Sequence, residues 1–425
     1  SVASHTDKYA AKDDRVLSFN GIEAMRGPEN TMILHHGTSD RRMIVRPEVV
    51  DALRLCTRFR TLQAHAKTIT EHLPTLKGQD QAVLDTLTSI DREGLFETSM
   101  DAWERLSKPL DNAPKPPPCR LFVLTCDRPA MLKRLMESLS NIPLPQEVEG
   151  IWVIDDSRSD KCMNQNAENI AAITSKLSTP VFHFDKRERQ ELIKFLSGQL
   201  PSQADSIAFL LDRETWGTAP TYGIARNFAL LISTGRRALI WDDDTIAEAI
   251  SSPLANSPLR FGIANDREAT FYKNSGVMEK FALPAERDPV SLMLSHLGQQ
   301  LGSILKNDSR GHRLLAGADG DIIRRFDATA RIMLSQCGSW GDPGTNSARW
   351  LLYQPANGIR RLLEDNEDIE SMLLGRLHWF GHLGTTLTSY GTLSQLTGLD
   401  HTDLLPPYLP AGRGEDILFG TMLQQ

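Results

Sequence analysis

Three consecutive aspartates, Asp242, Asp243 and Asp244, are the residues of this sequence best suited to chemistry. They directly follow the apolar run 238–241, which is typical of a buried strand. Because carboxylates cannot enter a core unpaired, that strand must end where they begin, at the rim of a sheet. Alternating carboxylates, here Asp242 and Asp244, can converge on one Mg²⁺ or Mn²⁺ ion, which could hold a diphosphate. The alternative is a solvated acidic turn.

Two other acidic pairs occupy positions where elements begin or end. Asp155 and Asp156 follow the apolar run 150–154 and could accept hydrogen bonds from a ligand N–H, or simply cap the next helix. Glu415 and Asp416 follow a glycine-rich turn and precede a predicted helix over 417–423. A carboxylate there could act as a general base, although a helix N-terminus also favours carboxylates that have no catalytic role.

The elements that must position these residues alternate in type. Apolar runs at 120–124, 150–154, 181–184 and 238–241 predict strands. Amphipathic or helix-favouring stretches lie between them, over 130–139, 190–196 and 218–234. This alternation predicts an α/β domain with a mostly parallel sheet flanked by helices, in which acidic residues share the rim where ligands bind.

A separate domain is predicted before this sheet. Residues 43–45 favour a strand, and Pro47 suits the first turn of a helix extending to residue 59. Further helices are expected from residue 60 and around 83–90, whereas 1–30 should be poorly ordered. We therefore expect a small helical or winged-helix domain over 1–110, a proline-rich linker over 111–118 and the α/β domain over 119–425.

Composition restricts the classes of partner. The chain has 425 residues, a formal net charge of −7 and five cysteines without a C-x-x-C pair. The negative charge argues against nucleic acid as the main partner, and scattered cysteines favour a reduced, cytoplasmic protein. No apolar run approaches the roughly 20 residues that a membrane-spanning helix needs, so no integral membrane segment is expected.

Five motifs in a fixed order give the chain a family resemblance. They are Thr125-Cys-Asp-Arg-Pro129, Val153-Ile-Asp-Asp-Ser157, Gly223-Ile-Ala-Arg-Asn227, Trp241-Asp-Asp-Asp244 and Gly412-Arg-Gly-Glu-Asp-Ile-Leu-Phe-Gly420. Their order and spacing resemble GT-A-fold (Rossmann-like) glycosyltransferases akin to family 2. The resemblance implies a metal-dependent, hexosyltransferase-like enzyme that takes a sugar from a nucleotide-diphosphate donor, with UDP-sugars the common choice.

The resemblance also implies roles for individual residues. Nucleoside contacts would come from Thr125, Asp127 and Arg128, with Asp155 or Asp156 on the N–H of the base. Three residues of one helix would pack against the donor: Gly223, Arg226 and Asn227. Asp242 and Asp244 would hold Mn²⁺ or Mg²⁺, and Asp243 could reach the ribose or sugar. Asp416, with Glu415 as the alternative, would be the general base of an inverting transfer.

The acceptor depends on weaker patterns. Pro47 with its helix, Phe59-Arg-Thr-Leu62 and Gly94-Leu-Phe96 resemble PqqD-like peptide-recognition domains, which implies a peptide or protein acceptor bound with help from the N-terminal domain. Otherwise the acceptor is a saccharide or lipid-linked saccharide. In the long insert 246–405, Trp340 could stack on an acceptor sugar or pack onto the core, and His378 and His382 would share one face if their segment were helical.

Two other function classes fit parts of this pattern. A nucleotidyltransferase also places a nucleotide over a parallel sheet, but it calls for a glycine-rich phosphate loop after the first strand, and 125–129 contain no glycine. A non-catalytic recognition protein could keep the fold, although damage to the acidic motifs would then be expected.

Overall fold

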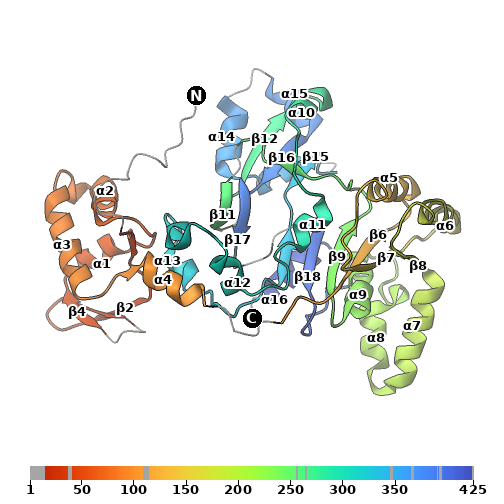
Figure 1. Cartoon of the computed structure of the whole chain (residues 1–425), viewed down its shortest axis with the longest axis horizontal. Helices are drawn as coiled ribbons and strands as arrows, with labels where there is room; N and C mark the ends of the chain where they lie inside the picture. Colours follow the sequence, from red (N-terminus) through yellow and green to blue (C-terminus); the bar gives the residue numbers. More distant parts are fainter. Residues whose placement is uncertain are drawn as a thin grey trace. The chain divides into compact units, whose positions relative to one another are not determined.

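The computed structural model describes residues 15–36, 41–108, 114–254, 257–263, 266–344, 348–364, 368–389, 391 and 395–423. The chain forms two compact units. The first combines the chain up to residue 113 with 259–262 and 300–330, and the second contains the remainder (Figure 1). No described helix is long and apolar enough to cross a membrane.

A six-stranded sheet is the framework of the second unit, with the order β14-β18-β9-β6-β7-β8 (Figure 1). Strands β9, β6, β7 and β8 are parallel to one another, whereas β18 pairs antiparallel with β9 and the edge strand β14 pairs antiparallel with β18. The bounds are β6 (Cys119–Thr125), β7 (Val148–Asp155), β8 (Val181–Phe184), β9 (Arg237–Asp242), β14 (Leu334–Gln336) and β18 (Leu396–Asp400). The predicted α/β class with a mostly parallel, helix-flanked sheet is therefore confirmed.

Side chains of the central strands alternate between two apolar cores. In β6, Leu121 and Val123 pack in a core with α5 (Pro129–Leu139) and α6 (Asp160–Thr174). Phe122 and Leu124 pack on the opposite face with α8 (Ala204–Leu211) and α9 (Tyr222–Ser233). Because both faces are covered, the strands read as continuous apolar runs, which is why the sequence pattern located them.

The region predicted as an insert carries its own antiparallel sheet, β12-β16-β15. It consists of β12 (Glu268–Tyr272), β16 (Leu377–Gly381) and β15 (Ser339–Gly341), with α10 (Ser275–Lys280), α14 (Ala356–Glu364) and α15 (Ile369–Gly375) beside it. His378 lies in β16 and not in a helix. The expectation that His378 and His382 share a helical face is wrong, because β16 pairs along its length with β12.

Within its described residues up to 108, the first unit contains an antiparallel three-stranded sheet, a two-stranded pairing of β1 (Leu17–Ser18) with β5 (Glu97–Thr98) and four α-helices. The sheet, β2-β3-β4, is formed by β2 (Ile22–Arg26), β3 (Met32–His36) and β4 (Arg42–Val45). The helices are α1 (Pro47–Leu53), α2 (Leu62–His72), α3 (Asp80–Arg92) and α4 (Ser99–Leu106). For residues 15–30, the strands β1 and β2 contradict the expected loose start, since Leu17 and Phe19 belong to the apolar core. Residues 1–14 of that prediction lie outside the described residues.

A distant segment completes this first unit. Helix α1 ends at Leu53, earlier than the predicted residue 59, and the backbone beyond it pairs with residues 317–320. Phe59 N donates to Ala318 O at 2.9 Å, and Gly320 N donates to Thr57 O at 2.7 Å. Gly320 opens α13 (Gly320–Ile323), where an added Cβ would lie 2.0 Å from Ser18 Oγ. Part of the predicted insert therefore belongs to the N-terminal unit.

Candidate functional site

The predicted acidic motifs meet where the strand order of the large sheet reverses. From β6, the chain places β7 on one side and β9 on the other, so the carboxyl ends of β6 and β9 flank a topological switch point. Ligands of open α/β sheets bind at such points. Asp242 is the last residue of β9, and Thr125 is the last residue of β6.

Asp243 is completely buried and braces the two strand ends. Thr125 Oγ1 donates to Asp243 Oδ2 at 2.6 Å, and Arg128 Nη2 lies 2.6 Å from Asp243 Oδ1. Burial raises the pKa of the Asp243 carboxyl to about 6, despite the stabilising Thr125 hydroxyl and the Arg128 charge. Asp243 is thus engaged within the protein, which leaves the alternating pair, Asp242 and Asp244, to face a ligand.

Asp242 and Asp244 each pair with an arginine. Arg226 Nη2 donates to Asp242 Oδ1 at 3.1 Å, and Arg128 Nη1 donates to Asp244 Oδ2 at 2.9 Å. Their side chains remain 28% and 43% exposed, respectively, so both can be reached. Burial raises the pKa of Asp242, opposed by Arg226 and reinforced by Asp244. A cation would relieve this repulsion between neighbouring carboxylates.

The oxygen donors of Asp242 and Asp244 suit Mg²⁺ or Mn²⁺ in type. Within the described ranges, no three or more His, Cys, Asp or Glu side chains are grouped so that they could hold a metal ion. Two carboxylates alone fit the usual magnesium arrangement, in which substrate phosphates and water complete the coordination. The pair therefore fits a cation that binds together with a phosphorylated ligand.

The second acidic motif reaches the same site through Arg226. Helix α16 (Glu415–Met422) starts with Glu415, whose Oε1 lies 3.6 Å from Arg226 Nη1. Burial raises the pKa of Glu415, which is only 7% exposed. Asp416 is partly exposed, and its Oδ1 accepts a hydrogen bond from Ile417 N. One guanidinium thus joins two motifs that are more than 170 positions apart in the sequence.

Helix α9 holds the segment that carries this second motif. Asn227 Nδ2 donates to Tyr408 O at 3.0 Å, and Tyr408 N donates to Asn227 Oδ1 at 2.8 Å. At Gly223, an added Cβ would lie 2.0 Å from Leu409 O. The structure therefore places Gly223 and Asn227 against the chain before α16, and not at an open face where a donor could bind.

Positive φ angles shape the turn that leads into α16. Gly412 and Gly414 have φ values of 94° and 92°, which side chains other than glycine rarely adopt. The two glycines allow the abrupt turn that places Glu415 and Asp416 in the first helical turn, where the helix dipole favours their negative charge.

The other predicted nucleoside residues are occupied by protein partners. Asp155 is fully buried and accepts from Ser157 N, Asn166 Nδ2 and His183 Nε2 at 2.9, 2.9 and 3.1 Å. These bonds lower the pKa of Asp155 against the raising effect of burial. Asp127 Oδ1 accepts from the N–H groups of Arg158 and Ser159, at the start of α6.

Asp156 forms ion pairs with two arginines that were not among the predicted site residues. Arg189 Nη1 and Arg213 Nη1 donate to opposite oxygens of Asp156 at 2.7 and 2.6 Å. Arg189 lies in the charged stretch 185–189, which reads as a solvated face, yet its side chain is 9% exposed. Sequence alone offers no signal for this pairing, since the partners lie 33 and 57 positions from Asp156.

Trp340, the predicted acceptor residue, lies in β15 of the insert sheet. Its ring centroid is 5.4 Å from that of Tyr272, in a cluster that also contains Met278 and Trp379. The structure therefore places Trp340 in the local packing of the insert sheet.

Comparison with known proteins leaves the resemblance to glycosyltransferases as a prediction. Neither the protein-family models nor the curated proteins include a match to this sequence. Any functional assignment therefore depends on the geometry described above and on the motifs.

The raised pKa of Asp243 gives a testable pH dependence. Its folded pKa of about 6 exceeds the unfolded value of about 3.9, so the folded state binds the proton more tightly. The free energy of unfolding should therefore fall by up to about 2.7 kcal/mol as pH rises from about 4 through 6. In Asp243→Asn, this pH-dependent fall in the free energy of unfolding should be absent from denaturant titrations at pH 4, 5, 6 and 7.

Thr125→Val is the matched variant for this measurement. It removes the hydroxyl that stabilises the Asp243 carboxylate, so the fall in stability should shift to higher pH. If the free energy of unfolding changed with pH in the same way for the wild type and Asp243→Asn, the assignment of a raised pKa to this carboxyl would be contradicted.

Proposed function

We propose that this protein is a glycosyltransferase that moves a sugar from a nucleotide-diphosphate donor, with a UDP-sugar as the expected donor, to an acceptor. The observation that supports it best is Arg226, which pairs with Asp242 at the end of β9 and with Glu415 at the start of α16. Both acidic motifs of the resemblance therefore lie at one switch point of a parallel sheet, where this class of enzyme needs them.

Two arginines would bind the donor's diphosphate in this proposal. Arg128 bridges Asp243 and Asp244, and Arg226 bridges Asp242 and Glu415, so each guanidinium is fixed beside the carboxylate rim. Fixed guanidiniums suit phosphate oxygens. Asp242 and Asp244 would hold Mg²⁺ or Mn²⁺, which when bound supplies Lewis-acid stabilisation of the diphosphate leaving group.

Asp416 is the proposed general base. The acceptor oxygen attacks the anomeric carbon and gives its proton to the Asp416 carboxylate, while the bond to the diphosphate breaks and its electron pair leaves with the diphosphate. Attack from the face opposite the leaving group would invert the configuration. Asp416 is preferred over Glu415 because Glu415 is buried and paired with Arg226, whereas Asp416 is partly exposed.

The acceptor is proposed to be a peptide or protein that binds with help from the first unit. Its antiparallel sheet ends in the edge strands β2 and β4, where an extended peptide can add a strand. Met25 and Ile44 are exposed on these strands and could contact alternate side chains of such a peptide. The five cysteines form no disulfide among the described residues, which fits the proposed cytoplasmic location, and a saccharide or lipid-linked acceptor is the alternative.

Thermal stabilisation by nucleotides tests the donor site. UDP or one UDP-sugar, present with Mn²⁺ at 100 times its dissociation constant, should add roughly 2.7 kcal/mol to the free energy of unfolding. Asp242→Asn and Asp244→Asn should lose the metal-dependent part of that shift. Asp342→Asn, which alters a partly exposed aspartate in a loop after β15, serves as the control and should keep it.

The products of turnover separate the remaining classes of function. A glycosyltransferase releases the nucleoside diphosphate from a nucleotide sugar, whereas a nucleotidyltransferase releases pyrophosphate from a nucleoside triphosphate. Absence of a shift with any nucleotide, in the presence or absence of Mn²⁺, would contradict the transferase assignment and favour a recognition protein.

A further inference from the structure

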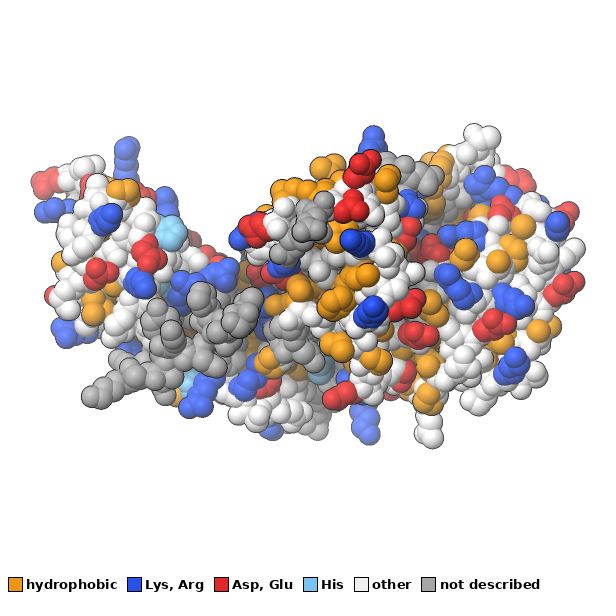
Figure 2. All heavy atoms as spheres, turned by 90° about the horizontal axis from the view of Figure 1, so that it is seen from above, with side chains coloured by type: hydrophobic (Ala, Val, Ile, Leu, Met, Phe, Trp, Pro, Cys, Tyr) orange, Lys and Arg blue, Asp and Glu red, His pale blue; other side chains and the backbone are white. Residues whose placement is uncertain are grey.

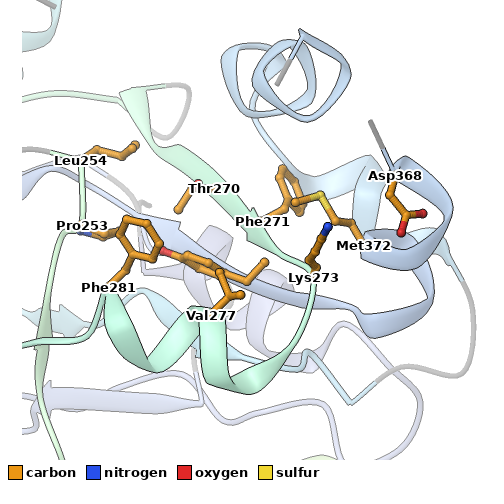
Figure 3. Close-up of a pocket in the computed structure, with 10 residues that line it drawn as sticks. Pro253, Leu254, Thr270, Phe271, Lys273, Val277, Phe281, Asp368 and Met372 are labelled. Atoms are coloured by element: carbon orange, nitrogen blue, oxygen red, sulfur yellow. The ribbon is translucent and has the colours of Figure 1, made fainter. Parts of the chain in front are cut away.

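A cavity of about 520 Å³ lies in the insert, over strand β12. We call it the insert cavity, and its apolar wall includes Pro253, Leu254, Tyr272, Val277, Phe281 and Met372. Figure 3 shows these elements around it: the 253–254 loop, β12, α10 and the start of α15. Cavities of this size typically bind drug-sized ligands.

Two apolar side chains that line this cavity are largely exposed to solvent. Phe281 is 52% exposed and Leu254 is 40% exposed, and Leu283 and Leu374 are exposed nearby in the sequence. Figure 2 shows hydrophobic side chains gathered in the middle of the face that contains the insert. Isolated exposed apolar residues need no explanation, but several beside a cavity are typical of a binding surface.

Tyr272 gives the cavity a polar group without a partner. Its side chain is 4% exposed, and within the described part of the chain its hydroxyl has no hydrogen-bond partner. A buried hydroxyl that lacks a partner is unfavourable, so a ligand that supplies one gains binding energy. Burial raises the pKa of Tyr272 to about 12, so the hydroxyl stays protonated and can donate.

Aromatic rings flank Tyr272 on two sides. The Phe281 ring centroid is 5.8 Å away and the Trp340 ring centroid is 5.4 Å away. Since Phe281 is half exposed and follows the end of α10, its ring can turn without unpacking a core. A ligand ring could then lie against Phe281 and reach the Tyr272 hydroxyl.

Charged side chains lie at the other end of the cavity. Lys273 and Asp368 line it beside Met372, away from Pro253 and Phe281 (Figure 3). Asp368 also caps α15 by accepting from Ser371 N at 3.0 Å. The cavity thus has a largely apolar end, where Tyr272 and Thr270 carry hydroxyl groups, and a charged end.

We propose that the insert cavity is a second ligand site, which binds a ring-sized apolar group carrying a hydrogen-bond acceptor such as a carbonyl oxygen. The ring would pack among Val277, Phe281 and Met372, and the acceptor atom would take the proton of the Tyr272 hydroxyl in a hydrogen bond. This site is independent of nucleotide binding, so its test does not depend on the proposed transfer reaction.

Two small probes test the proposal on the full chain. Acetophenone has a ring and a carbonyl acceptor, and ethylbenzene has a similar shape without the acceptor. Ligand-observed NMR titration should show saturable binding of both, with acetophenone the tighter. Tyr272→Phe should weaken the binding of acetophenone about 2- to 10-fold and leave the affinity for ethylbenzene unchanged, because only one hydrogen bond is removed.

Blocking variants locate the bound probes. Val277→Trp should obstruct the apolar end of the cavity with an indole ring and abolish binding of both probes there. Leu254→Arg, at an exposed position on the loop, is the second blocking variant should Val277→Trp fail to fold. Leu352→Arg is the control: Leu352 is 82% exposed, lies outside the cavity lining, and its replacement should leave both affinities unchanged.

Three outcomes would overturn the proposal. They are the absence of saturable binding by either probe, binding that persists in a folded blocking variant, and an equal loss of affinity for both probes in Tyr272→Phe. The last result would show that Tyr272 supports the cavity without donating to the ligand.

Discussion

Gly223→Ala should destabilise the second unit by at least about 3 kcal/mol, because the new methyl group has no room. A Cβ at this position would lie 2.0 Å from Leu409 O and 2.8 Å from Leu409 C, and backbone atoms cannot move aside as a flexible side chain can. Either α9 or the chain before α16 must shift. Denaturant titration measures the decrease in the free energy of unfolding. The stabilisation of this variant by nucleotides should also be smaller than that of the wild type.

Gly198→Ala is the matched control for this prediction. Gly198 lies near the end of α7 (Lys186–Gln199), and a Cβ there would meet no heavy atom within 4 Å. Alanine in a helix is favoured over glycine by roughly 0.5–1 kcal/mol, so this variant should be slightly more stable than the wild type. Similar stabilities for the two variants would argue that α9 does not pack closely against residues 408–410.

Asp416→Asn should reduce the rate of sugar transfer by about 10²- to 10⁴-fold if Asp416 is the general base. Donor binding should persist, because the arginine that links the acidic motifs pairs with Asp242 and Glu415. Single-turnover transfer from the donor identified by thermal shift measures the rate. The same thermal shift, repeated on the variant, measures donor binding.

Glu415→Gln separates the two acids of this motif. It removes the negative partner of Arg226 at 3.6 Å, so it should weaken donor binding as well as lower the rate. A wild-type rate in Asp416→Asn together with a 10²-fold loss in Glu415→Gln would assign the base to Glu415. Wild-type rates in both variants would place the base elsewhere.

The large sheet was predictable because its strands are covered on both faces. Burial on two sides requires continuous apolar runs, such as Leu121–Leu124 in β6, and such runs are visible in a single sequence. The acids that end β7 and β9 were visible for the same reason, since a carboxylate marks where a buried strand must stop.

The hydrogen-bond partners of those acids were not predictable. Asp155 and Asp156 were expected to face a nucleobase, yet Asn166, His183, Arg189 and Arg213 occupy their oxygens. These partners come from different elements and carry no spacing rule that links them to Asp155 or Asp156. Similarly, Gly223 was expected to admit a ligand, and only the tertiary structure shows that Leu409 takes this space.

The insert was the least predictable part because its strands are short and its contacts distant. Strand β15 has three residues, and its partner β16 lies almost 40 positions away. Local periodicity cannot identify pairs of this kind. The same holds for the segment 300–330, whose apolar side chains Leu314, Leu315 and Ile323 are buried in a unit that begins nearly 300 residues earlier.

Because the segment 300–330 belongs to the first unit, stretches of the two units alternate along the sequence. A gene fragment ending at residue 113 would lack α13 and the backbone partners of Phe59 and Thr57. No single contiguous fragment of the gene therefore encodes the whole N-terminal unit. End-to-end fusion of two ancestral genes would not produce this connectivity either. A graft that preserved it would need to carry all three stretches of the first unit, with new linkers in place of the second-unit segments that separate them in the sequence.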